Sequence, residues 1–426
     1  MDPRHKIRCI VPPPPSQGGD LSKVATDALI ECAHDSKERW WVRAAVIREL
    51  GRRLEESELA PLEKVLRNRA ENPSVRIPAL KSMCAVVSEG DLQARTLVAW
   101  LQAQSGIDGG YGFAEQVLAA RAGLGDVSVS LELAVLASDA WTHRRACALD
   151  ALRMLAERVG EVAILAELGC ASYLAMATDA PRFEVRLHGV RELHDAGEDI
   201  TPFLADPSRI VARYVFDALT DSDVNVTVAR QLAETAQSQE ARAWAALTLF
   251  RAGMPLKEAM AFLEEPFVSL PGVPDEIRHA ILREYAPGQR ETNPRWLLER
   301  ATLPTGPSED ELEERADARL KRLMEALQAL GLKPETPISA GDAFQQGSGT
   351  YFKITIPGSS MLQLSTLGPF IIDEEETPAD IRAAAEACGL TWVEEYAPLP
   401  FSGLCVYHFG KREPLRVGEL LFYWQD

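Results

Sequence analysis

The fold is decided by stretches such as Asn72-Pro73-Ser74-Val75-Arg76-Ile77-Pro78-Ala79-Leu80-Lys81-Ser82-Met83. Asn72 is a favourable N-cap and Pro73 a favourable first helical residue, so a helix is expected to begin here. Arg76, Ala79 and Met83 then follow at positions i, i+3 and i+7, which lie on one face of a helix. The small residue in the middle allows a second helix to approach closely. The stretch therefore predicts a helix that packs against another helix.

The same spacing recurs five more times between about residues 20 and 255. The arginines of the six copies are Arg43, Arg76, Arg145, Arg186, Arg213 and Arg242. The copy at Arg213 fits less well, because its large apolar residue, Leu219, comes one position early. The intervals of 33, 69, 41, 27 and 29 residues predict one degenerate copy within 95–125. A pair of helices of about 30–40 residues cannot bury its apolar face alone, so the copies are expected to stack.

Residues 20–255 resemble HEAT-type repeats, whose second helix tends to open with Asp and Pro, followed by Val-Arg and a spaced Ala. The closest matches are Asn72-Pro73-Ser74-Val75-Arg76 and Asp206-Pro207-Ser208-Arg209-Ile210. The resemblance implies an α-solenoid of about seven antiparallel helix pairs without strands. It also places the six arginines at equivalent positions near the start of the second helix of each pair. Repeat proteins of this kind act through a long curved surface.

The chain is expected to divide into four segments. Residues 1–19, with four consecutive prolines, are a flexible Pro-rich arm. Residues 20–300 form the HEAT-like α-solenoid, closed by short helices. Residues 301–350 are a helical linker, whose helix at 309–330 has an acidic first turn that suits the helix dipole. Residues 351–426 form a small α+β domain. The short closing helices are expected at 256–264, 274–285 and 294–300.

The C-terminal domain shows strand-like alternation and matches no family motif. Two strands are predicted at 351–356 and 361–366, and a helix follows from 377 to 388. Further strands are expected at 390–395, 404–409 and 417–423. The order ββαβββ predicts a mainly antiparallel sheet with one small core of its own. We expect this domain to fold separately and to hold no fixed orientation.

Composition narrows the classes of partner. Of 426 residues, 46% are hydrophobic and 25% charged, as in a folded globular protein, and the net charge is −18. Residues 331–426 carry thirteen acidic and six basic side chains, so neither part of the chain is basic. This balance argues against nucleic acid and anionic membranes as partners. The chain has no apolar run long enough for a transmembrane helix and no signal-peptide core, so a cytoplasmic location is expected.

The sequence predicts no catalytic, cofactor-binding or metal-binding residues. The seven cysteines include no CxxC pair and are expected to be reduced, as in a cytosolic protein. His188 and His194 are six residues apart and would lie on different faces of one helix. The segment at 221–225 opens like a calcium loop, but Val226 and Leu232 stand where glycine and glutamate are required. No hydrolase or zinc-protease motif occurs.

Two groups of residues are candidates for binding a partner. Adjacent tryptophans at the start of a repeat helix, Trp40 and Trp41, cannot both face the core, and an exposed tryptophan suits an interface. Packing at the end of the solenoid is the alternative. The acidic run Asp373, Glu374, Glu375 and Glu376 could contact a basic partner. Its alternative role is favourable charge before the C-terminal helix.

These features favour a non-enzymatic, protein-binding scaffold that uses a curved helical-repeat surface. The partner is expected to be another protein of basic character that touches both parts of the chain. One alternative is an immunity protein that neutralises a basic bacterial toxin. Another is a HEAT-type lyase or chaperone acting on a bound cofactor, because certain phycobilin lyases are similar HEAT-type solenoids. No residue of this sequence supports assigning that activity to it.

Overall fold

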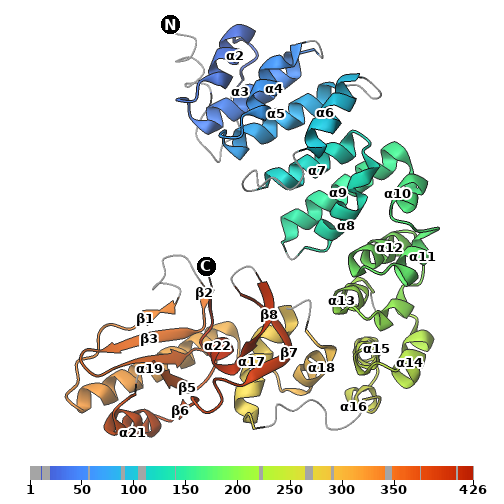
Figure 1. The fold of residues 1–426 in the computed structure, drawn as a ribbon. Helices are drawn as coiled ribbons and strands as arrows, with labels where there is room; N and C mark the ends of the chain where they lie inside the picture. The colour runs from blue at the N-terminus through green and yellow to red at the C-terminus, as the bar shows by residue number, and fades with distance from the viewer. Residues whose placement is uncertain are drawn as a thin grey trace. The chain divides into compact units, whose positions relative to one another are not determined.

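The computed structural model is mostly helical, with strands near the C-terminus (Figure 1). The chain divides into two compact units, Met1–Ala196 and Gly197–Asp426. The coarse expectation of a helical part followed by an α+β part is confirmed. The expected arm 1–19 lies outside the described residues, apart from Val11. The structure describes residues 11, 20–55, 58–87, 92–103, 112–139, 141–219, 224–263, 272–288, 292–340, 348–374, 376–408 and 411–425.

The first unit consists of helices, and its described residues include no strand. Two helices, α6 and α7, occupy the region where a degenerate copy was expected. The helices are α2 (Thr26–His34), α3 (Trp40–Arg53), α4 (Ala60–Arg67), α5 (Pro73–Val86), α6 (Leu92–Gln102), α7 (Phe113–Gly123), α8 (Ser130–Ala137), α9 (Thr142–Val159), α10 (Glu161–Glu167), α11 (Tyr173–Asp179) and α12 (Phe183–Asp195), with a short 3-10 turn, η2 (Val127–Val129).

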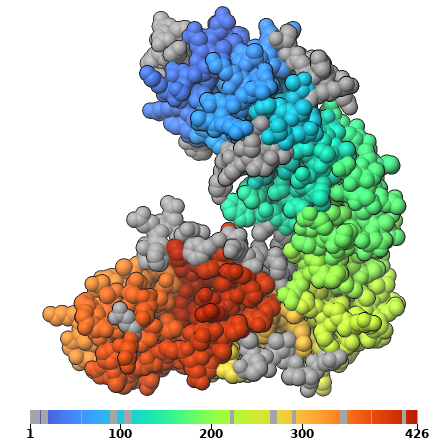
Figure 2. All heavy atoms as spheres, in the orientation of Figure 1, coloured from blue at the N-terminus to red at the C-terminus, as the bar shows by residue number. Residues whose placement is uncertain are grey.

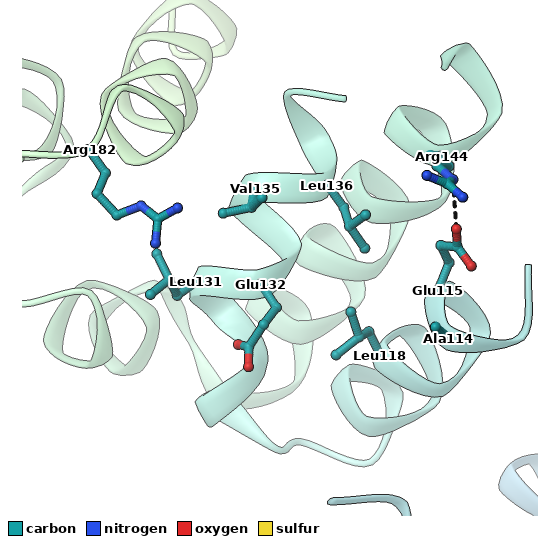
Figure 3. Close-up of a pocket in the computed structure, with 9 residues that line it drawn as sticks. All are labelled: Ala114, Glu115, Leu118, Leu131, Glu132, Val135, Leu136, Arg144 and Arg182. Atoms are coloured by element: carbon teal, nitrogen blue, oxygen red, sulfur yellow. Dashed lines mark ion pairs between the residues drawn. The ribbon is translucent and has the colours of Figure 1, made fainter. Parts of the chain in front are cut away.

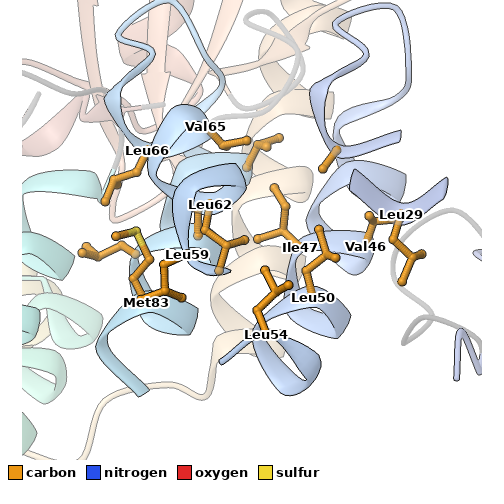
Figure 4. Packing of buried hydrophobic residues seen from close by; sticks show 14 of the residues in the cluster. Leu29, Val46, Ile47, Leu50, Leu54, Leu59, Leu62, Val65, Leu66 and Met83 are labelled. Carbon is orange, nitrogen blue, oxygen red and sulfur yellow. The ribbon is translucent and has the colours of Figure 1, made fainter. Parts of the chain in front are cut away.

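Apolar side chains at helical spacing form the core between these helices. Ile47 and Leu50 of α3 are fully buried beside Leu62 of α4, as Figure 4 shows. Met83, the large apolar residue of the copy at Arg76, joins the same cluster from α5. Because each helix here has one apolar face, its burial depends on the neighbouring helix. The packing that the spacing predicts is therefore present.

Five of the six recurring arginines occupy the same place, the fourth residue of a helix. These are Arg43 of α3, Arg76 of α5, Arg145 of α9, Arg186 of α12 and Arg242 of α15. Each donates to a carbonyl oxygen at or within two residues of the end of the preceding helix, over 2.6 to 3.1 Å. The acceptors, in the same order, are the carbonyls of Ala33, Leu66, Asp139, Ala180 and Ala236.

These bonds have a clear physical role. The last carbonyls of a helix lack an intrahelical partner, and positive charge is favourable at that end. One guanidinium therefore provides a hydrogen-bond donor for a carbonyl at or near the end of the first helix, and it holds the second helix against that end. At α3 the contact continues along the helix, because Arg53 donates to the carbonyls of Val24 and Leu21. Late residues of α3 thus meet early residues of the chain before it, so α2 and α3 are antiparallel.

Arg213 departs from the pattern, and the expectation of six equivalent positions is wrong there. It is the fifth residue of α13 (Arg209–Ala218), and its Nε donates to Asp217 over 2.9 Å. The element before α13 is a short 3-10 helix, η3 (Thr201–Ala205), so no α-helical C-terminus stands where the arginine would bind. The one-residue displacement already visible at Leu219 in the sequence accompanies this difference.

The helices of the second unit follow the expected positions closely. The short helices and the helix at 309–330 are confirmed to within a few residues at their ends. Ser308 forms a capping box with Glu311, which explains the sharp start of the longest helix. After η3 and α13 come α14 (Val226–Thr235), α15 (Gln239–Arg251), α16 (Leu256–Met260), α17 (Asp275–Tyr285), the turn η4 (Ala286–Gly288), α18 (Pro294–Thr302) and α19 (Glu309–Ala329).

A five-stranded sheet with the order β1-β3-β4-β5-β6 follows. Neighbouring strands are antiparallel except β5 and β6, which are parallel and connected through α21. One face carries Ile354, Leu362 and Ile371, which pack against Leu323 and Leu327 of α19. The elements are β1 (Ile338–Ser339), β3 (Tyr351–Ile356), β4 (Ser360–Ser365), β5 (Phe370–Asp373), α21 (Ala379–Ala387) and β6 (Thr391–Trp392).

The α19 contact differs from the expectation of a helical linker at 301–350. The helix supplies part of the core of the sheet, and β1 also comes from this segment. A further difference concerns 417–423, where a strand was expected and the helix α22 (Val417–Leu421) is found. Its capping box with Glu419 starts a helix despite the β-rich composition. The remaining strands are β2 (Ser348–Gly349), β7 (Pro400–His408), β8 (Lys411–Arg416) and β9 (Trp424–Gln425).

A second core joins these last elements to helices that come much earlier in the chain. Buried residues of α17 and α18, including Ile281 and Trp296, share one cluster with Phe401 of β7 and Leu420 of α22. In Figure 2 the orange and red atoms of the C-terminal part form one continuous mass. The segment 351–426 therefore does not hold all of its core within itself, contrary to the expectation.

Candidate functional site

A cavity of about 520 Å³ lies between helices of the first unit, and we call it the α7–α8 cavity (Figure 3). Its apolar lining comes from Leu118 of α7 and from Leu131, Val135 and Leu136 of α8. Helix α8 carries apolar residues on several faces, so some of them remain after its core contacts are made. Leu131 is 37% exposed, which shows that the cavity opens to solvent. The cavity is therefore an open, mostly apolar hollow with charged residues at its edge.

Charged side chains stand around this apolar lining. Arg144 of α9 forms an ion pair with Glu115 of α7, with Nε and Oε1 2.7 Å apart. Arg182, the N-cap of α12, pairs with Glu184 at 3.2 Å, and its side chain is half exposed. Glu132 is exposed and has no ion-pair partner among the residues that the structure describes. One negative charge is therefore available at the rim of the cavity.

The two tryptophans have different environments, although they are adjacent in the sequence. Trp40 is 41% exposed, whereas Trp41 packs against the core of the first helices. Their rings meet edge to face with centroids 5.8 Å apart, and the guanidinium of Arg39 lies 5.1 Å from the Trp41 ring. Trp41 is therefore a packing residue, and Trp40 keeps a partly free face that could contact a partner.

The acidic run before α21 has intramolecular contacts. Asp373 accepts hydrogen bonds from the backbone N–H of Thr377 and from Arg382, and its side chain is only 13% exposed. Glu374 accepts from the side chain of Gln363 over 2.6 Å. Glu376 is exposed, and Glu375 lies outside the described residues. Asp373 therefore closes the turn before the helix, and Glu374 and Glu376 remain the surface candidates of this run.

The histidine considered as a metal ligand is buried in the contact between α11 and α12. Burial lowers the pKa of His188 to about 4, so the ring is neutral at pH 7. Its Nδ1 lies 3.5 Å from Glu192, whose pKa is raised by burial and by nearby Asp195. The Tyr173 ring packs edge-on against the imidazole at 6.3 Å. These neighbours suit a neutral core histidine.

The cysteines and metal-binding residue types are dispersed. Cys84 is mostly buried, and burial raises the pKa of its thiol to about 12, which makes it a poor nucleophile at neutral pH. No three His, Cys, Asp or Glu side chains in the described ranges lie close enough to hold a metal ion. The free thiols within those ranges are Cys32, Cys84, Cys147, Cys170, Cys388 and Cys405.

The residues of the α7–α8 cavity were not singled out by the sequence. The available signal was the composition of α8, Ser130-Leu131-Glu132-Leu133-Ala134-Val135-Leu136-Ala137, which is apolar on more faces than one neighbouring helix can cover. Comparison with family models, curated proteins and solved structures finds no match to this chain. Across the described residues, every helix is too short or too polar to cross a membrane.

Proposed function

We propose that this chain is a protein-binding scaffold built on HEAT-type helix pairs, and that it works by binding rather than by catalysis. The observation that carries the proposal is the recurring bond from the fourth residue of a helix to the end of the helix before it. It appears in five pairs, two of which are the pairs around Arg43 and Arg242. A repeated joint of this kind favours a stacked array, and such arrays present extended surfaces to partners.

The proposed partner is a protein of basic character. The chain carries 63 acidic and 45 basic side chains, a balance that attracts positively charged proteins over long distances. Surface carboxylates such as Glu132 and Glu376 are available for close contacts. An interaction of this type weakens as salt concentration rises, because exposed charges are screened.

The test is chemical cross-linking of the full-length chain in its native cell, followed by capture and identification of cross-linked peptides. The expected result is one protein, or a few, recovered in near-stoichiometric amounts, with cross-links to the helical segments. Binding of the purified partner should weaken from low to high salt. Recovery of a small molecule and no protein, or turnover of a metabolite by the purified chain, would contradict the proposal.

A further inference from the structure

The α7–α8 cavity combines a broad apolar lining with charges at its edge. Leu118, Leu131, Val135 and Leu136 leave apolar surface open to solvent within one concave site. Burying such surface is favourable by about 25 cal/mol for each Å². A side chain with the size of Leu, Phe or Trp would gain most from this site, because these residues bury the largest apolar areas.

The rim favours a cation beside that apolar group. Glu115 is neutralised by Arg144, and Arg182 is matched by Glu184. The Glu132 carboxylate has no ion-pair partner among the described residues, so it is the lining carboxylate available to a cation. A lysine or arginine about one helical turn from the apolar anchor would reach it.

We propose that the α7–α8 cavity receives a large apolar side chain from a protein partner, with a neighbouring Lys or Arg bound at Glu132. This inference rests on the proposed protein-binding function and assigns it a site and a type of partner segment. A small-molecule site is the weaker alternative. Such sites enclose most of the ligand and direct polar groups at it, whereas here Glu115 and Arg144 engage each other and Leu131 is open. An apolar pocket with a polar rim is typical of an interface anchor.

The test uses the full-length protein and a phage-displayed library of random dodecapeptides. Peptides selected on the wild-type protein are counter-selected against Leu131→Asp, and the enriched peptide is synthesised for affinity measurement. We expect enriched peptides to share a large apolar residue with a Lys or Arg close by. Leu131→Asp should weaken binding roughly 30-fold, as loss of an anchor contact does. Glu132→Gln should weaken it about threefold to tenfold, and increasingly so at low salt.

Matched controls are present in the same unit. Leu174 is the second residue of α11, as Leu131 is of α8, and it is more exposed at 57%. Glu161 lies in the first turn of α10, as Glu132 does in α8. Leu174→Asp and Glu161→Gln should leave peptide affinity unchanged, which separates loss of the site from general effects of the substitutions.

Three results would overturn the inference. They are failure to enrich any peptide, a consensus with acidic neighbours, and equal losses in the control variants. Phenethylamine offers an apolar amine without a peptide chain. If it bound at the cavity while no peptide was selected, the site would belong to small molecules. A partner captured from cells that binds Leu131→Asp and wild-type protein equally would overturn this site and leave the proposed function standing.

Discussion

The helix pairs of the first unit and the second core of the C-terminal unit are held together over very different distances along the chain. In the pair α2–α3, Arg43 binds the carbonyl of Ala33, ten residues before it. In the second core, the Tyr285 hydroxyl donates to the Leu420 carbonyl, 135 residues later, and the Trp296 indole donates to Ser402 over 3.0 Å. The contacts between neighbouring helices appear in the sequence as a recurring arginine spacing, whereas the long-range contacts of the second core correspond to no sequence pattern.

The difference has consequences for folding. Contacts between neighbouring helices can form as soon as a pair is made, and each pair then supports the next. The second core must bring α17 and α18 together with β7 and α22. Closing the long loop between them costs conformational entropy before the contacts of the core offset that cost. We therefore expect the second core to form last and to depend on an intact chain.

The largest expected effect is that of cutting the chain between these distant partners. A fragment of residues 331–426 lacks Ile281 and Trp296, and it also lacks Leu323 and Leu327 of α19. It should be unfolded or aggregated, whereas 197–426, which is compact by itself, should unfold cooperatively. Circular dichroism and urea titration distinguish these outcomes. A cooperative transition in the short fragment would show that its strands need no help from the helices.

The substitution Trp296→Ala tests the same core without cutting the chain. Trp296 is 1% exposed, its ring packs at a tilt against Phe401 with centroids 4.9 Å apart, and its indole N–H donates to the Ser402 carbonyl. Its removal should lower the free energy of unfolding of the second unit by about 3–5 kcal/mol. Hydrogen exchange should show lost protection in β7 and β8. The control Trp40→Ala, at a partly exposed site, should leave both units protected, and equal effects of the two changes would contradict the assignment.

The sequence predicted the parts of the molecule in which local chemistry decides. The cap at Asn72 and the spacing that follows each arginine act within a few residues, so the helices and the shared helical position of five arginines could be predicted. The strand expected at 417–423 is the helix α22, which begins at a capping box with Glu419 and is buried in one cluster with α17, so its β-rich composition did not decide its structure. The α7–α8 cavity depends on how three helices meet, which spacing within one helix does not determine.

A third prediction concerns the effect of pH on the packing of His188 between α11 and α12. Because the folded pKa of His188 is about 4, below its ordinary 6.5, the unfolded chain binds a proton first as pH falls. Stability of the first unit should therefore decline from about pH 6.5 to pH 4, by about 3 kcal/mol in total. Glu192 works in the opposite direction, because its raised pKa relieves a buried charge as pH falls.

The contribution of His188 is obtained by difference. His188→Gln should remove the decline from the curve of unfolding free energy against pH, whatever its effect at pH 7. His143→Gln, at an exposed position of the same unit, is the control and should follow the wild-type curve. Parallel curves for wild type and His188→Gln would show that the buried imidazole is not the source.

A smaller effect is expected at the arginine joints themselves. Arg76 is 3% exposed, donates to the Leu66 carbonyl and lies 3.9 Å from the Phe113 ring. Arg76→Met keeps the apolar stem but leaves that carbonyl unsatisfied, at about 2 kcal/mol of stability. Arg213→Met removes a pair with Asp217, whose side chain is half exposed, and a 3.3 Å hydrogen bond to the Pro287 carbonyl, and should change stability by about 1 kcal/mol. Equal losses of unfolding free energy in urea titrations would mean that the bond from Arg76 to the Leu66 carbonyl contributes no more than the contacts of Arg213.

The smallest effect separates structure from recognition in the acidic run. Asp373 bonds to the Thr377 N–H and to Arg382, so Asp373→Asn should lower the stability of the second unit by about 1 kcal/mol. The exposed Glu374 side chain accepts a hydrogen bond from the half-buried Gln363, and Glu374→Gln should change stability by less than about 0.5 kcal/mol. If a basic partner uses this run, Glu374→Gln should weaken its binding at low salt while thermal unfolding stays unchanged. Equal binding by wild type and Glu374→Gln at low salt would mean that the run serves only the turn before α21, which Asp373 closes through its bonds to Thr377 and Arg382.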